Sequence, residues 1–126
     1  MASYILDENI SPVVAVQVSQ KAPDVVIFSI SHWHNGEYLN TDGAVILQQA
    51  FDENLTLITF DLSTIRPLLK AWSEDGRSHG GVIFIDDKTI ASNNHGKIVK
   101  SIIQVSEQLK RSDFINGVMF LRRPGQ

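Results

Sequence analysis

The sequence predicts an α/β fold, a three-layer Rossmann-like sandwich whose mainly parallel five-stranded sheet lies between helical layers. Two observations predict it. Short runs of β-branched and aliphatic residues recur along the chain, and segments with apolar residues at helical spacing separate them. Strands that alternate with helices pair in parallel through right-handed crossovers, so this order favours one sheet covered on both faces. Because we find no repeat or linker, we expect residues 1–126 to form a single domain.

Five short apolar runs are the expected strands. The first ends in acid at Asp7, and the third is followed directly by Asp61. The second is continuous, which is typical of a strand buried on both faces. The expected strands are residues 3–7, 24–30, 55–60, 81–85 and 117–121.

Four segments have apolar residues at helical spacing. Ser11 and Pro12 favour a helix start, because proline at the first helical position gives up no donor that the helix needs. Thr41 or Asp42 is expected to cap the second helix, after a polar loop at residues 31–40. The last segment has an apolar face broad enough for the core and for a second subunit, so we expect a homodimer. The expected helices are residues 11–21, 42–51, 63–72 and 97–109.

Composition excludes several classes of protein. Hydrophobic residues at 43% and charged residues at 20% are ordinary for a globular domain. The absence of cysteine excludes disulfides and thiolate metal sites and fits a reducing compartment. No apolar run is long enough to span a bilayer and no signal peptide is evident, so we expect a cytoplasmic protein without a membrane partner. A net charge of −3 argues against bulk coating of nucleic acid, but not against a nuclease with a local basic patch.

Acidic residues stand where the expected strands end. Asp7 and Asp61 each close a strand, and ligands of open α/β sheets bind at that edge. Asp42 joins them if the loop at residues 31–40 returns over the same edge. Neighbouring carboxylates repel one another unless a cation neutralises them, and Mg²⁺ or Mn²⁺ prefers oxygen ligands. We therefore predict that Asp7, Asp42 and Asp61 form a catalytic metal site that polarises a phosphoryl oxygen and activates water.

The roles within this site differ. Asp7 and Asp61 are expected to be metal ligands, and Asp42 to hold the metal or act as general base. Helix capping alone, at about 1 kcal/mol each, would explain Asp42 or Asp61 singly. Capping does not explain why two strands of one sheet end in acid. Four further residues are expected to contact the acidic side chains and not the metal itself: Glu8, Asn9, Thr59 and Ser63.

The order of these motifs resembles the PIN-like group of the PIN nuclease superfamily. The matching stretches cover about two thirds of the chain: L-D-E-N-I-S-P at residues 6–12, T-D-x-x-x-I-L-x-x-A at 41–50, T-x-D at 59–61 and G-V-I-x-I at 81–85. The resemblance implies a Rossmann-like sheet and Mg²⁺- or Mn²⁺-dependent cleavage of an RNA substrate. It also implies a role as the toxin of a toxin–antitoxin pair, with an antitoxin protein as partner. By matching position, Asp7, Asp42 and Asp61 inherit the acidic-site roles.

One position departs from the family pattern. Relatives often continue T-x-D-x-D-F, but here Ser63 stands where the second acid would be. A site short of one carboxylate would bind metal weakly or hold a single ion, so a PIN-like binding module without catalysis is one alternative.

A receiver domain of two-component signalling is the second alternative. Asp7, Glu8 and Asp61 fit its outline, but Asp86 stands where a receiver has Ser or Thr, and no Lys-Pro closes the fifth strand. In the loop, His32-Trp33-His34 could suggest a metal site or base stacking. We expect instead that Trp33 packs the loop onto the sheet.

Overall fold

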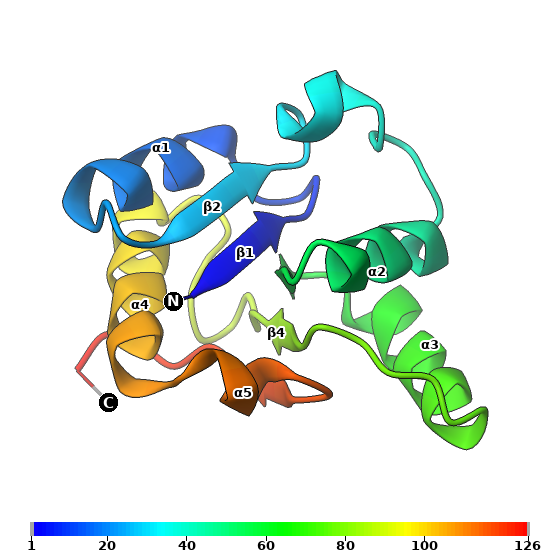
Figure 1. The fold of residues 1–126 in the computed structure, drawn as a ribbon. Coiled ribbons are helices and arrows are strands. Elements are labelled where there is room, and N and C mark those ends of the chain that lie inside the picture. Colours follow the sequence, from blue (N-terminus) through cyan, green and yellow to red (C-terminus); the bar gives the residue numbers. More distant parts are fainter. Residues whose placement is uncertain (1, 126) are drawn as a thin grey trace.

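The computed structural model describes residues 2–125, apart from the side chain of Arg111. It confirms the predicted α/β class: five strands form one all-parallel sheet with helices on both faces (Figure 1). The order across the sheet is β2-β1-β3-β4-β5. The strands are β1 (Ser3–Leu6), β2 (Val26–Ser29), β3 (Thr56–Thr59), β4 (Val82–Phe84) and β5 (Val118–Phe120).

Two helices cover each face of the sheet. Helices α1 (Pro12–Lys21) and α4 (His95–Gln108) pack against each other on one face, and α2 (Gly43–Asp52) and α3 (Leu62–Glu74) lie on the other (Figure 1). Alternation along β1 divides the core between them. Tyr4 and Leu6 join the cluster beneath α1 and α4, whereas Ile5 joins the cluster beneath α2 and α3.

All predicted strands and helices are present, with their ends shifted by a few residues. Helix α4 begins two residues earlier than expected, because the Asn94 side chain accepts a hydrogen bond from the Lys97 N–H at 3.3 Å and so caps it at His95. Two short elements were not predicted: the 3₁₀ turn η1 (Trp33–Gly36) and the one-turn helix α5 (Arg111–Phe114).

Strand β2 corrects one prediction. It is not buried on both faces, since Val26 is 36% exposed and Phe28 39% exposed. β2 lies at the sheet edge and pairs only with β1. The buried cluster beneath α2 and α3 contains residues of β1, β3 and β4 but none of β2. These two helices therefore do not cover the face of β2 that carries Val26 and Phe28.

The chain changes direction between β1 and β3. From β1 it passes through α1 outward to β2, and β3 then pairs with β1 on the opposite side. The segments that leave β1 and β3 therefore turn to opposite faces of the sheet, toward α1 and α3. In doubly wound sheets this switch point opens a crevice at the carboxyl ends of the two strands, where ligands bind.

Candidate functional site

A pocket of about 340 Å³ lies at this switch point. Its walls come from three separate segments: the end of β1, the entrance of α2, and the end of β3 with the first turns of α3. All three predicted acids, Asp7, Asp42 and Asp61, line it. The complete lining is Asp7, Glu8, Asn9, Thr41, Asp42, Gly43, Ile46, Leu57, Asp61, Thr64 and Ile65.

Asp7 and Asp61 stand on the same rim because Thr59 joins them. The Thr59 side chain is fully buried, and its hydroxyl donates to Asp7 Oδ2 at 2.7 Å. The same hydroxyl accepts the Asp61 N–H at 2.9 Å. Asp7 also extends the pairing of β1 with β3, since its N–H donates to the Ile58 carbonyl at 3.0 Å. The predicted convergence of these two strand ends is therefore present.

Asp61 also caps helix α3. Its Oδ1 accepts the Thr64 N–H and the Ser63 hydroxyl, both at 3.1 Å. Within residues 2–125 no hydrogen bond reaches its Oδ2. Capping and lining the pocket are thus compatible at this position, because the cap engages only Oδ1.

Asp42 behaves differently. It occupies the N-cap position of α2 with φ −56° and ψ 140°, yet its side chain makes no capping hydrogen bond. The prediction that Thr41 or Asp42 caps the helix is therefore right about the N-cap position and wrong about the capping bond: the Asp42 side chain is exposed at the pocket, and the Thr41 hydroxyl donates to the Leu39 carbonyl.

Two contacts hold the loop of residues 30–42, which joins β2 to α2, over the edge of the sheet where the strands end. At its far end, Glu8 Oε1 accepts the Asn40 N–H, where Asn40 has a left-handed φ of 57°. This bond ties the loop after β1 to the residues just before Thr41 and Asp42. Glu8 therefore acts on the site by positioning a loop.

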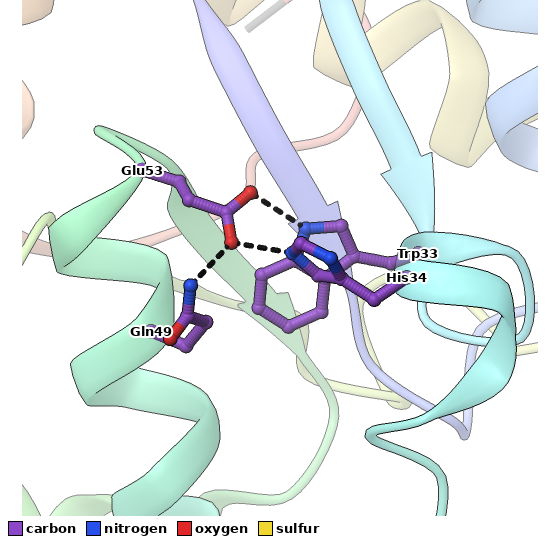
Figure 2. Close-up of polar contacts among 4 residues, drawn as sticks. All are labelled: Trp33, His34, Gln49 and Glu53. Atoms are coloured by element: carbon purple, nitrogen blue, oxygen red, sulfur yellow. Dashed lines mark hydrogen bonds and ion pairs between the residues drawn. The ribbon is translucent and has the colours of Figure 1, made fainter.

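The second contact is a cluster around Glu53, at the end of α2 (Figure 2). Glu53 Oε1 accepts the Trp33 indole N–H at 3.1 Å, and Oε2 accepts from Gln49 at 2.7 Å and from His34 Nε2 at 2.6 Å. Trp33 is 3% exposed, and its ring stacks against Tyr38 with centroids 4.7 Å apart. Trp33 also belongs to the buried cluster that contains Ile5, Leu57 and Phe84 of the strands, so the expectation that it packs the loop onto the sheet is confirmed.

The Glu53 pKa reflects these donors. Partial burial raises it, but the hydrogen bonds from Gln49, His34 and Trp33 together outweigh burial, and the pKa lies below its ordinary value. A carboxylate only accepts, so His34 Nε2 carries the proton in this contact.

Among the described residues, the pocket acids accept side-chain hydrogen bonds only from the hydroxyl groups of Thr59 and Ser63. Within the described residues none of Asp7, Asp42 and Asp61 forms a salt bridge with a basic side chain. Nor do any three His, Cys, Asp or Glu side chains of residues 2–125 lie close enough together to hold a metal ion. The available donors are oxygens, which suits Mg²⁺, an ion that often takes one or two carboxylates and completes its shell with water and substrate phosphate.

The remaining predicted residues have local roles. Asn9 Oδ1 accepts the Phe60 N–H at 3.4 Å, linking the loops after β1 and β3. Ser63 is exposed and reaches the pocket only through Asp61. Asp86 is exposed, and its carboxylate accepts the Lys88 N–H at 2.9 Å within a turn.

Sequence reasoning did not single out Thr64 or Gly43. Thr64 lines the pocket as the third residue of α3, a position that the cap at Asp61 could have signalled. A Cβ at Gly43 would lie 3.0 Å from the Ile65 side chain, so glycine permits the close approach of α2 to α3.

Comparisons of the chain with profiles of known protein families, with curated proteins and with solved structures give no match. Among residues 2–125, no helix combines the length and the hydrophobicity needed to cross a bilayer.

Proposed function

We propose that this protein is a Mg²⁺- or Mn²⁺-dependent ribonuclease of the PIN-like type. The observation that carries the proposal is the lining of one pocket by Asp7, Asp42 and Asp61, which come from three separate segments. The pocket lies at the switch point of the sheet, where this strand order favours ligand binding. Carboxylates that share a pocket without a basic partner favour a bound cation.

Each acid has a role in this proposal. Asp7 and Asp61 would hold the metal ion, directly or through water. With Mg²⁺ or Mn²⁺ bound there, the site would gain a Lewis acid for a phosphoryl oxygen and a bound water of lowered pKa. Asp42, which is free of a capping bond, orients the attacking water or takes its proton. Thr59 and Ser63 keep the carboxylates of Asp7 and Asp61 in place through their hydroxyl groups.

The cellular setting is part of the same proposal. The chain would act in the cytoplasm on RNA as the toxin of a toxin–antitoxin pair, restrained by an antitoxin protein, and would form a homodimer. The motif resemblance supports the action on RNA and the toxin role. The apolar residues of α4 add no support for the homodimer, because Ile98, Val99, Ile102 and Val105 are buried in this chain's own core.

A PIN-like binding module without catalysis is the second candidate. It is favoured by Ser63 at the position of an expected acid and by the lack of a three-ligand cluster within residues 2–125. A receiver domain has less support. The residues after β4 are Ile85 and Asp86, and those after β5 are Leu121 and Arg122, so neither point offers the hydroxyl or the lysine of a receiver.

The test compares RNA cleavage in Mn²⁺ by the wild type and by Asp61→Asn. Asparagine keeps an oxygen for the Thr64 N–H, so the cap persists while the charge is lost. We expect cleavage to fall by at least about a hundredfold. Asp86→Asn is the matched control, because it removes a charge outside the pocket and should leave the rate unchanged.

Two outcomes would decide against this mechanism. Equal cleavage by wild type and Asp61→Asn would remove the acidic site from the reaction. Inactivity of both proteins, with Mn²⁺ binding absent in calorimetry, would favour the binding module.

A further inference from the structure

A second concave site lies between α4 and β5, away from the acidic pocket. It is a groove of about 220 Å³, and it shares no residue with that pocket. Met119 and Leu121 of the β5 segment form an apolar floor, and Val105 and Leu109 form an apolar wall. Arg122 stands at the rim with its side chain exposed.

The position of α4 explains this groove. The helix packs against α1, over the cluster formed with β1, β3 and β4, and β5 lies beyond it at the sheet edge. Met119 is consequently only partly buried although it faces the same cluster.

Ser101 is the feature that points to a ligand. It lines the groove and is only 3% exposed, yet its hydroxyl has no hydrogen-bond partner within the described part of the chain. Buried polar groups are nearly always paired, and leaving one unpaired costs free energy. Ser106, on the same helix, is paired as expected: its hydroxyl donates to the Ile102 carbonyl and contacts the Tyr4 hydroxyl, both at 2.7 Å.

The chemistry of the lining defines the ligand class. An apolar floor favours a hydrocarbon body, the Ser101 hydroxyl can bond one polar atom, and a guanidinium at the rim favours a carboxylate. No acidic side chain lines the groove among residues 2–125. Its volume is below the usual range of about 300–1,000 Å³ for drug-sized ligands, so the ligand is small.

We propose that the groove between α4 and β5 binds a small monocarboxylate with an apolar body, held by the Ser101 hydroxyl and Arg122. This site is separate from the acidic pocket and does not depend on nuclease activity. Occupancy would satisfy the buried hydroxyl and cover the exposed side of Met119.

The experiment is an NMR titration of the full chain with benzoate and with benzamide, its neutral counterpart. Benzoate should produce saturable shifts centred on Ser101, Met119 and Leu121 and bind at least about fivefold more tightly than benzamide. Arg122→Gln should remove that preference. The matched control Arg123→Gln should retain it, because Arg123 lies outside the groove and donates to the Thr89 carbonyl.

Serine variants test the buried hydroxyl separately. Ser101→Ala should weaken binding of both ligands by about five- to tenfold, while the melting temperature of the free protein stays the same or rises. Ser106→Ala, the matched control, should lower the melting temperature, because it breaks the contact with Tyr4.

Three results would overturn the proposal. One is the absence of saturable shifts at about 10 mM of either compound, a concentration that detects even millimolar affinity. Another is benzoate binding that is unaffected by Ser101→Ala. The third is a fall in melting temperature for Ser101→Ala equal to that of Ser106→Ala, which would mean that the hydroxyl already has a partner.

Discussion

Two groups of carboxylates in this protein have opposite surroundings. Glu53 accepts hydrogen bonds from the side chains of Trp33, His34 and Gln49, and its contact with His34 is an ion pair when that imidazole is protonated. The pocket acids accept only hydroxyl and backbone donors, and Asp42 makes no capping bond at all. Side chains of the protein donate to both oxygens of Glu53, whereas no basic side chain within residues 2–125 forms a salt bridge with a pocket carboxylate.

This difference separates a structural carboxylate from one that is available for chemistry. Removing Glu53 would strand three donors, two of which hold the loop of residues 30–42 in place. Removing a pocket carboxylate would relieve repulsion among like charges. The first group should therefore affect mainly stability, and the second mainly activity.

The largest expected effect comes from Asp42→Ala. RNA cleavage in Mn²⁺ should fall by about a hundredfold or more, since the proposed general base is lost. The melting temperature should change by no more than about 2 °C, because no capping bond is broken. A fall of the size expected for a lost cap, with cleavage intact, would assign Asp42 to the helix and not to the reaction.

Glu53→Ala should lower the free energy of unfolding by about 2–3 kcal/mol, because three side-chain donors lose their acceptor and one of them, the Trp33 indole, is buried. Chemical denaturation measures this loss. Asp52→Ala is the control: Asp52 is exposed, and within residues 2–125 its carboxylate accepts a hydrogen bond only from Gln48, so the variant should cost less than about 0.5 kcal/mol. If both variants lost the same free energy of unfolding, the hydrogen bonds to Glu53 would not stabilise the fold.

Ser63→Asp tests the pocket by adding negative charge to it instead of removing charge. It places a second carboxylate beside Asp61, where the serine hydroxyl now lies 3.1 Å from Oδ1. We expect Mn²⁺ affinity in calorimetry to rise about fivefold, because a nearby negative charge favours the cation. Ser73→Asp, near the other end of α3, should leave affinity unchanged, and a similar gain there would reduce the effect to net charge.

The smallest effect concerns pH. The folded pKa of Glu53 lies below its ordinary value of 4.5, so its contribution to stability is complete above that pH and is lost as the pH falls through the folded pKa. The difference in unfolding free energy between wild type and Glu53→Gln should therefore shrink as the pH falls below the ordinary Glu pKa of 4.5 and through the lowered folded pKa. A difference that stays constant over this range would show that the charge of Glu53 is irrelevant to the cluster.

The convergence of Asp7 and Asp61 was predictable from the sequence. Apolar runs locate strand ends, and parallel topology brings those ends to one edge. Thr59 was expected nearby, but not its shared hydroxyl, because only the register of β1 against β3 places that group beside the Asp7 carboxylate.

The sequence predicted Asp42 at the pocket only on the condition that the preceding loop returns over the same edge, and Asp42 does line the pocket. The contacts that bring the loop there were not predictable, because they join residues remote in sequence. The Asn40 N–H meets Glu8, and Trp33 and His34 meet Glu53. These contacts need left-handed backbone at residues such as His34, with φ 48°, which no periodic pattern reveals.

The position of β2 at the edge of the sheet could not be predicted from the sequence either. An apolar run such as that of β2 reads the same in the middle of a sheet as at its margin, and only the pairing of strands decides how much of it is exposed. The unpaired hydroxyl of Ser101 was equally invisible, since a serine on an apolar helix face usually bonds to the helix backbone.

Every residue that lines the acidic pocket belongs to positions 7–65. A ribosome will have made all of them before it reaches β4, the strand that covers the open side of β3. Until β4 pairs with it, β3 is an unprotected edge strand. The pocket is therefore complete in sequence before the sheet that carries it is complete, and β4 finishes that sheet without contributing a lining residue.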